Sequence, residues 1–542
     1  MGNNRTPLQL RLALCCSGLL SILCFPSFNH GQLAWGTFVP FLLAVPRLPF
    51  KTVLRWSFLA GWLAGMGILY WIYPTCRWGG VNPVLSFFAL GGLAAHWGLF
   101  WLLFGAGVWF YSRRPLWEYP FWAAAAWTVL EWLRGTLFSG FPWLPLSCSQ
   151  WQVPKHLPLA EWGGGYAVSF MILLFNGAVT VILKGLVGKE KQPWAGVPSL
   201  ITLVGLTACS VFLWRKPMAM AGPPIPVSVV QGNIDQYKKW DEAYEAEIVQ
   251  TYSTLTRKIP LIDPLRPQGP TFFVEAPVND KSLKTAMSRD PVPATTFSSN
   301  LILWPETAVP GWIPNDEKYT RWIQGLAKEA HTPLLTGAVT RQENRDYNAA
   351  FLLSATGQFL GHYRKNHLVP FGEYVPLRSV LAPFVKVLNE LGTFDQGKEA
   401  TVFPISGARL GVTICFEGLF PRLVARFTRE GAQILVNITN DGWYRHTAAP
   451  EQHFAASVVR AVENRRWVVR AANTGYSGFI SPRGEVVART KLMEPAVLLG
   501  HPEPTDVQTF YVRHGDVFIL FLGLLMLGGM ILERWPHRTP QT

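Results

Sequence analysis

Three short segments in the second half of the chain place reactive side chains directly after predicted β-strands. These side chains are Glu306, Lys365, Glu373, Cys415 and Glu417. A cysteine attacks a carbonyl as the thiolate, and the ordinary pKa of its thiol is ~8.5. A neighbouring carboxylate can remove the thiol proton, and a neighbouring ammonium can stabilise first the thiolate and then the oxyanion. One Glu, one Lys and one Cys therefore suffice for acyl transfer without a metal or a cofactor.

Each of these residues, taken singly, also has an ordinary structural explanation. A glutamate after a strand is usually solvated, a loop lysine usually lies at the surface, and a buried cysteine usually serves packing. A disulfide framework is not expected around Cys415, because the other six cysteines lie in or beside the apolar N-terminal region. A zinc site is not favoured either, because the histidines are scattered and a single thiolate is available.

The elements that must position these residues are typical of an α/β domain. From Pro224 onward, short runs rich in β-branched residues alternate with helical stretches. The runs are 227–230, 301–304, 334–339, 412–415 and 434–438. Layered α/β folds carry polar residues and chemistry at the carboxyl ends of such strands.

The region 1–220 has the composition of a membrane domain. The whole chain is 49% hydrophobic and 15% charged, against about 25% charged in an average soluble domain, and charge is sparsest before residue 220. Stretches that approach the roughly 20 apolar residues of a spanning helix are 8–26, 32–48, 53–74, 84–111, 117–138, 160–183, 196–214 and 517–532. We therefore predict about eight spans, seven within 1–220 and one within 513–542, which flank a catalytic domain over 221–512.

The lysines and arginines of short loops predict the orientation of these spans. With a cytoplasmic N-terminus, the inner loops carry Arg5, Arg11, Arg47, Lys51, Arg55, Arg113, Arg114, Lys184, Lys189, Lys191, Arg534 and Arg538, and the outer loops carry only Arg77, Arg134, Lys155, Arg215 and Lys216. Seven spans then leave 215–515 outside the cytoplasm, and a miscount by one span would invert this result. The same loops explain the formal charge of +14 better than nucleic-acid binding does, because no basic run is interleaved with aromatic residues.

Two charged residues, Glu131 and Arg134, fall within a predicted span. Charges at membrane depth are costly and usually face protein or a wet cavity. We interpret them as an ion pair near a helix end; the alternative is the lining of an entrance for lipid head groups.

The order and the flanks of the reactive residues resemble the carbon–nitrogen hydrolase (nitrilase) superfamily. The matching segments are WPE at 304–306, YRKNHLVPFGEYVP at 363–376 and CFE at 415–417. This resemblance implies an αββα sandwich with a Glu–Lys–Cys triad. The predicted spans, the EWLRG…GFPW stretch and the QGN-x-x-Q-x-x-KW segment at 231–240 resemble one branch of the superfamily, the bacterial apolipoprotein N-acyltransferases.

The resemblance also implies roles for individual residues. Glu306 would be the general base, Lys365 would stabilise the thiolate and the tetrahedral intermediate, and Cys415 would carry the acyl group as a thioester. Positions that match supporting or substrate-binding residues of the family are Asn348, Glu373, Glu417 and Trp240. Trp240 is equally well interpreted as a core aromatic.

The implied activity is transfer of an acyl chain from a phospholipid, such as phosphatidylethanolamine, to the N-terminal amine of the diacylglyceryl-cysteine of an apolipoprotein. The implied place is the periplasmic side of the bacterial inner membrane. No cofactor is implied, and nothing in the sequence requires a second copy of the chain. A lid is expected to keep water from the thioester, with 361–375 and 440–447 as candidates.

Two departures from the family pattern accompany the match. The stretch 260–300 is longer than the pattern and is interpreted as a mobile surface insertion, and Phe416 stands where a tyrosine often follows the nucleophile. Two other functions stay open. A membrane-tethered nitrilase or amidase would share the triad, although one anchor would suffice for a soluble substrate. A transporter or scaffold with an inactive binding module is opposed by the intact Glu, Lys and Cys.

Overall fold

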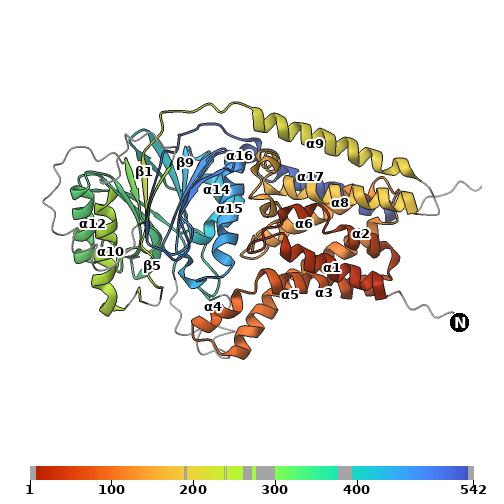
Figure 1. Cartoon of the computed structure of the whole chain (residues 1–542), viewed down its shortest axis with the longest axis horizontal. Helices are drawn as coiled ribbons and strands as arrows, with labels where there is room; N and C mark the ends of the chain where they lie inside the picture. Colours follow the sequence, from red (N-terminus) through yellow and green to blue (C-terminus); the bar gives the residue numbers. More distant parts are fainter. Residues whose placement is uncertain are drawn as a thin grey trace, which may run out of the picture. The chain divides into compact units, whose positions relative to one another are not determined.

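The chain folds as two compact units, drawn in Figure 1. The computed structural model describes residues 8–187, 192–236, 238–239, 241–259, 271–275, 300–375 and 394–534. The helical unit combines Met1–Lys216 with Thr509–Thr542, and the catalytic unit is Pro217–Gln508.

The first sheet of the catalytic unit contains seven strands in the described part of the chain, in the order β2-β13-β1-β3-β4-β5-β6. They are β1 (Val227–Gln231), β2 (Thr271–Glu275), β3 (Leu301–Leu303), β4 (Leu334–Gln342), β5 (Arg345–Leu353), β6 (Phe359–Arg364) and β13 (Ala496–Gly500). The central strands β1, β3 and β4 are parallel, whereas the flanking pairs are antiparallel. Strand β2 falls inside the predicted insertion 260–300, and most of the remaining insertion lies outside the described residues.

The second sheet contains six strands within the described ranges, in the order β12-β11-β10-β9-β8-β7. They are β7 (Val402–Ile405), β8 (Ala408–Ile414), β9 (Ile434–Thr439), β10 (Trp467–Ala472), β11 (Gly478–Ile480) and β12 (Val486–Arg489). Its central strands β8, β9 and β10 are parallel, with Val412 opposite Val436 and Val436 opposite Val469. Parallel strands buried on both faces are expected to be this rich in Val, Ile and Leu.

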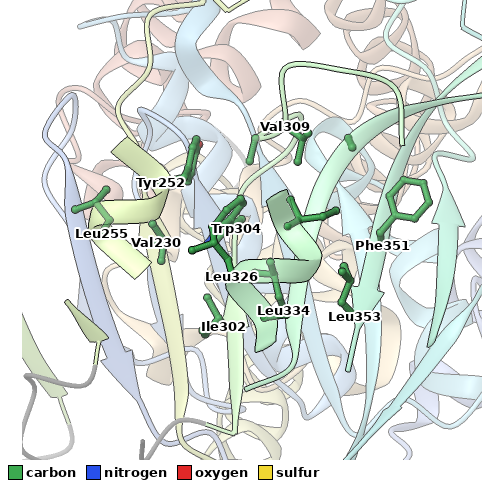
Figure 2. Packing of buried hydrophobic residues seen from close by; sticks show 14 of the residues in the cluster. Val230, Tyr252, Leu255, Ile302, Trp304, Val309, Leu326, Leu334, Phe351 and Leu353 are labelled. Atoms are coloured by element: carbon green, nitrogen blue, oxygen red, sulfur yellow. The ribbon is translucent and has the colours of Figure 1, made fainter. Parts of the chain in front are cut away.

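Helices cover the outer faces of both sheets, which makes the predicted αββα sandwich (Figure 1). They are α10 (Glu245–Arg257) and α12 (Glu317–Glu329) on the first sheet, and α14 (Pro421–Arg429) and α15 (Ala449–Asn464) on the second. Helix α10 buries Ile248, Tyr252 and Leu255 at helical spacing. Figure 2 shows Tyr252 against Trp304, with ring centroids 4.8 Å apart, in the core that holds the strand before Glu306.

The two ends of the catalytic unit run side by side. The Ala221 amide donates to the Pro504 carbonyl at 2.8 Å, and the Ile225 amide donates to the Pro502 carbonyl at 3.0 Å. The pairing continues into the antiparallel strands β1 and β13. The catalytic unit therefore begins and ends at one place.

The helical unit contains fewer long helices than predicted. Among the described residues, three helices are long and apolar enough to cross a membrane, and the bent pair α3 (Phe50–Ile68) and α4 (Ile72–Trp78), with a 48° bend, raises this to four. The other helices that correspond to predicted spans are α1 (Leu8–Leu23), α5 (Pro83–Tyr111), α6 (Tyr119–Thr136), α8 (Gly165–Val187), α9 (Val197–Arg215) and α17 (Val517–Arg534). Helices α1 and α17 are apolar but short. The predicted count of about eight spans is thus not confirmed.

The prediction of one spanning helix over 32–48 is wrong. The segment folds as η1 (Gly31–Trp35), α2 (Val39–Ala44) and η2 (Val45–Arg47), because Gly36 and two prolines interrupt the helix. Asn176 of α8 accepts from the Phe38 amide at 2.9 Å and donates to the Ala34 carbonyl at 2.9 Å. Irregular backbone is tolerated at membrane depth only when other groups satisfy it in this way.

The broken segment nevertheless packs beside α6. The Trp35 indole donates to Gln150, beyond the last residue of α6, at 3.1 Å. The hydroxyl of Tyr119, the first residue of α6, donates to the Leu42 carbonyl at 2.7 Å. The Phe38 ring packs against Trp127 of α6 with ring centroids 4.7 Å apart, so the segment runs antiparallel to α6 beside the first half of that helix.

Glu131 and Arg134 of α6 are both buried and their charges act on each other, but their hydrogen bonds are made to other groups. The Glu131 carboxylate accepts from the Leu146 amide at 2.6 Å, and the Arg134 guanidinium donates to the Trp143 carbonyl at 3.1 Å. The guanidinium also lies 3.7 Å from the ring centroid of Trp97. Both charges thus hold the loop after α6 against the helix.

Candidate active site

The predicted triad residues lie at the ends of three strands. Glu306 follows β3, Lys365 follows β6, and Cys415 follows β8 in the other sheet. Their charges act on one another, because both Glu306 and Lys365 influence the Cys415 thiol. The sandwich therefore brings together three residues that are far apart in the sequence.

Lys365 is the centre of a buried cluster of charges. Its Nζ donates to Glu306 Oε1 at 3.2 Å and to Glu373 Oε1 at 2.9 Å, and its side chain is only 1% exposed. Burial acts to lower the pKa of Lys365, but the Glu306 and Glu373 carboxylates outweigh it and raise this pKa well above its ordinary value. The lysine is therefore a permanent cation.

Asn348, another predicted residue, spaces the two carboxylates. Its Nδ2 donates to Glu306 Oε1 at 2.7 Å and to Glu373 Oε1 at 2.9 Å. Its own carbonyl accepts from the Lys365 amide at 2.8 Å, which joins β5 to the lysine. Asn348 thus fixes the two acids through its side-chain amide and the main chain of the lysine through its carbonyl.

The second oxygen of Glu306 faces the other sheet. Glu306 Oε2 accepts from the Asn440 amide, just after β9, at 2.9 Å. The turn at Glu306 packs closely on Gly337 of β4, where a Cβ atom would lie 2.6 Å from the Glu306 Cα. Only glycine at 337 leaves room for this turn.

Cys415 is the first residue of η9 (Cys415–Leu419), and its φ is +54°. Left-handed conformations are uncommon for residues other than glycine and are found at constrained functional sites. The residue is partly exposed, but burial of the thiol, followed by the Glu306 charge, raises its pKa despite the opposing effect of Lys365. The raised pKa means that a base beside the thiol is needed to remove its proton, which is the role that the sequence predicts for Glu306.

Glu417 joins the lysine segment to the cysteine strand. Its Oε1 accepts from the Asn366 amide at 2.5 Å, the His367 amide at 3.0 Å and the Tyr363 hydroxyl at 2.8 Å. Its Oε2 accepts from the Ile414 amide at 2.8 Å. Burial raises the pKa of this carboxyl to about 7, while the amides, Lys365 and Tyr363 act to lower it.

Lys239 is a site residue that the sequence analysis missed. Its Nζ donates to the Glu306 carbonyl at 3.0 Å and to the Thr307 hydroxyl at 2.8 Å. Burial lowers the pKa of Lys239 to about 7, although the Glu306 and Cys415 charges oppose this shift. The available signal was its place in the segment 231–240, of which only Trp240 was selected, and Trp240 lies outside the described residues.

The two predicted lid segments supply parts of the site. The segment 361–375 carries Lys365 and Glu373, and 440–447 begins with the amide that binds Glu306. Each also exposes one large aromatic, Phe371 at 54% and Trp443 at 44%. Movement of these segments stays a prediction. In the described part of the chain, no group of three or more His, Cys, Asp or Glu residues is arranged to hold a metal.

Known families match both units. A model described as "Carbon-nitrogen hydrolase" matches residues 226–510, and one described as "Apolipoprotein N-acyltransferase N-terminal domain" matches 17–178. The chain is 35% identical to an apolipoprotein N-acyltransferase of Geobacter metallireducens, over 93% of this chain and 91% of the relative. It is 32% identical to one of Methylococcus capsulatus, over 94% and 93% of the two chains. A solved amidase from Nesterenkonia sp. aligns at 16% identity with a TM-score of 0.36, over 56% of this chain and 98% of the amidase.

Proposed function

Because the chain belongs to the apolipoprotein N-acyltransferase family and is thus a membrane acyltransferase acting on lipoproteins, we propose that its acyl donor is a phospholipid such as phosphatidylethanolamine. The acyl group then passes through a thioester on Cys415. The acceptor is the N-terminal amine of the diacylglyceryl-cysteine of an apolipoprotein. The observation that carries this proposal is the permanent Lys365 cation, which Glu306 and Glu373 hold within electrostatic reach of the Cys415 thiol.

The first half of the reaction forms the acyl-enzyme. Glu306 takes the thiol proton as sulfur attacks the ester carbonyl, and Lys365 stabilises the oxyanion of the tetrahedral intermediate. Because burial raises the pKa of the Cys415 thiol, proton removal and attack are coupled. When the intermediate collapses, the ester C–O bond breaks, Glu306 returns the proton to the departing alkoxide, and a lysophospholipid leaves.

The second half transfers the acyl group to the lipoprotein. The neutral α-amine attacks the thioester carbonyl, and Lys365 again stabilises the oxyanion. Glu306 takes a proton from the attacking nitrogen and delivers it to the thiolate as the C–S bond breaks. The amide product and the original thiol result, so the reaction consumes no cofactor.

We also propose that the catalytic unit lies on the periplasmic side of the bacterial inner membrane and works as a single chain. The segment 31–48 is not one helix, but its contacts with α6 and α8 are consistent with a crossing, which would give seven crossings before the catalytic unit. Seven crossings and the basic inner loops support an outside location. A cysteine-labelling scan of loop positions with a membrane-impermeant reagent tests this orientation.

Mass spectrometry of purified protein tests the chemistry. Incubation with phosphatidylethanolamine is expected to add one acyl mass to the peptide that contains Cys415, and a diacylated lipopeptide is expected to remove it and gain an amide-linked chain. Cys415→Ala is expected to fold and to form no adduct. Release of ammonia from small amides without acyl transfer would instead support an amidase, and full activity of Cys415→Ala would remove the nucleophile from the mechanism.

A further inference from the structure

The main chain at Cys415 is held in its uncommon conformation by side chains that the proposed reaction does not use. The Cys415 carbonyl accepts from Asn437 Nδ2 at 3.2 Å and from His453 Nε2 at 3.2 Å. Asn437 lies in the middle of β9, His453 lies on α15, and both are buried. A left-handed residue persists only when its surroundings over-determine it, and these two donors supply that constraint.

Arg470 of β10 orients both donors. Its guanidinium donates to Asn437 Oδ1 at 2.6 Å, so the amide nitrogen of Asn437 faces Cys415. The same guanidinium lies 2.9 Å from His453 Nδ1 and donates to Asp441 Oδ2 at 2.9 Å. Arg470 and Asp441 are fully buried, so this cluster is costly to desolvate unless it is paired as it is here.

The contacts of His453 determine which of its nitrogens carries a proton. A carbonyl only accepts, so Nε2 must carry the hydrogen that reaches Cys415. Nδ1 faces both the Arg470 guanidinium, which only donates, and Asp441 Oδ1 at 2.9 Å. Burial, followed by Arg470, lowers the pKa of His453 although Asp441 opposes this shift.

We propose that His453, oriented by Arg470 and Asp441, is a positioning residue for the nucleophile. With Asn437 it fixes the Cys415 carbonyl and thereby sets where the sulfur lies relative to Glu306 and Lys365. The expected effect on acyl-enzyme formation rests on the proposed function, whereas the positioning of the Cys415 thiol does not.

Two substitutions of His453 separate the contact with Cys415 from the contacts with Arg470 and Asp441. The amide nitrogen of His453→Gln occupies the place of Nε2 and keeps a donor to the Cys415 carbonyl. The amide of His453→Asn occupies the place of Nδ1 and keeps only the side that faces Arg470 and Asp441. Because a misplacement of about 1 Å can slow a reaction by about 10²-fold, His453→Asn is expected to be the strongly impaired variant.

The experiment measures the reactivity of Cys415 in the purified full-length protein in two ways. The rate of alkylation by iodoacetamide is followed on the Cys415 peptide by mass spectrometry, and the rate of acyl-adduct formation is followed with phosphatidylethanolamine vesicles. His453→Gln is expected to stay near the wild-type rate in both assays. His453→Asn is expected to be slowed in both, and by about 10²-fold in the second. His501→Gln, after β13, serves as the matched control with unchanged rates.

Equal rates for the two variants, or a faster His453→Asn, would overturn the proposal. If His453→Asn does not fold, Asn437→Asp is measured in its place. This substitution keeps the size of the side chain and its pairing with Arg470 but removes the other donor to the Cys415 carbonyl. A wild-type rate in Asn437→Asp would likewise overturn the proposal. Alkylation of wild-type Cys415 without any acyl adduct would contradict the proposed function. The positioning role of His453 would then be tested by the alkylation rates alone.

Discussion

The reactive residues are embedded in a set of buried charges that depend on one another. Lys365 is paired with two carboxylates, Glu306 and Glu373, and a single amide from Asn348 bridges the same two oxygens. Lys239 donates to the main-chain carbonyl of Glu306. Removing one member of such a cluster exposes the others to repulsion without water to relieve it.

Lys365→Met tests this dependence at the level of one residue. The substitution keeps the length of the side chain but leaves Glu306 and Glu373 facing each other, so the free energy of unfolding is expected to fall by about 3–5 kcal/mol. Turnover is expected to fall by about 10²-fold or more, because the oxyanion loses its partner. Thermal unfolding in detergent and the acyl-adduct rate measure the two effects. Wild-type stability in Lys365→Met would contradict the charge balance described here.

The lowered pKa of Lys239 predicts that the stability of the protein depends on pH. Its pKa of about 7 in the folded protein lies below its ordinary value of 10.5, so between these two values the unfolded chain binds more protons than the folded one. The contribution of Lys239 to stability therefore increases as pH rises through this window, by about 1 kcal/mol per pH unit. The free energy of unfolding of the wild type is therefore expected to increase relative to that of Lys239→Met between pH 7 and pH 8.5. Parallel pH profiles would show that Lys239 is not shifted in this direction.

At the scale of elements, several strands were predicted closely from the sequence, whereas the breaks in the predicted span 32–48 were not. The runs 227–230, 301–304, 334–339 and 434–438 correspond closely to β1, β3, β4 and β9, because buried parallel strands are continuous apolar runs. The predicted span 32–48 has the same apolar character. Its breaks are tolerated because Asn176, more than a hundred residues later, satisfies the freed backbone. Such long-range compensation leaves no local pattern in the sequence.

In the candidate site, too, some residues were predicted from the sequence and others were not. Glu306, Lys365, Cys415, Glu373, Glu417 and Asn348 were predicted from short motifs, and the structure gathers them. Their catalytic and supporting roles stay predictions. Lys239, Asn440 and His453 were not predicted, because each contact involves a main-chain atom: Lys239 and His453 donate to the carbonyls of Glu306 and Cys415, and Asn440 donates its own amide. A motif identifies side chains that meet a substrate more readily than side chains that hold a backbone.

The contact between β4 and the turn after β3 gives a test at this scale. Gly337→Ala would place a Cβ atom 2.6 Å from the Glu306 Cα and the Thr307 nitrogen. The turn must shift, so we expect stability to fall by about 1–3 kcal/mol and turnover to fall by about 10²-fold. Gly325→Ala is the matched control, since nothing lies within 4 Å of its Cβ on α12 and alanine favours a helix by about 1 kcal/mol. Equal behaviour of the two variants would disprove the close approach.

For the whole molecule, the important feature is that the catalytic unit carries its own core. The apolar cluster around Trp304 is built entirely from strands and helices of Pro217–Gln508. Its site residues also come from this unit alone. Its fold and its thiol chemistry are therefore expected not to require contacts from the helical unit.

Residues 217–508 expressed alone are accordingly expected to fold. Circular dichroism should show one cooperative thermal transition, and iodoacetamide should modify Cys415 at the rate found in the full chain. The same piece with Trp304→Ala should lose about 3–5 kcal/mol of stability, because a buried indole is removed from its core. Failure of the unaltered piece to show a cooperative transition would mean that the unit needs its membrane partner to fold.

The adjacent ends of the catalytic unit, joined by the Ala221–Pro504 and Ile225–Pro502 hydrogen bonds, have a consequence for how such a chain can arise. A domain whose first and last residues touch can be spliced into a loop of another protein without stretching that loop, and its termini can be relocated by circular permutation. The catalytic unit can thus be inserted into a loop of another protein as one piece, without a change in its own topology.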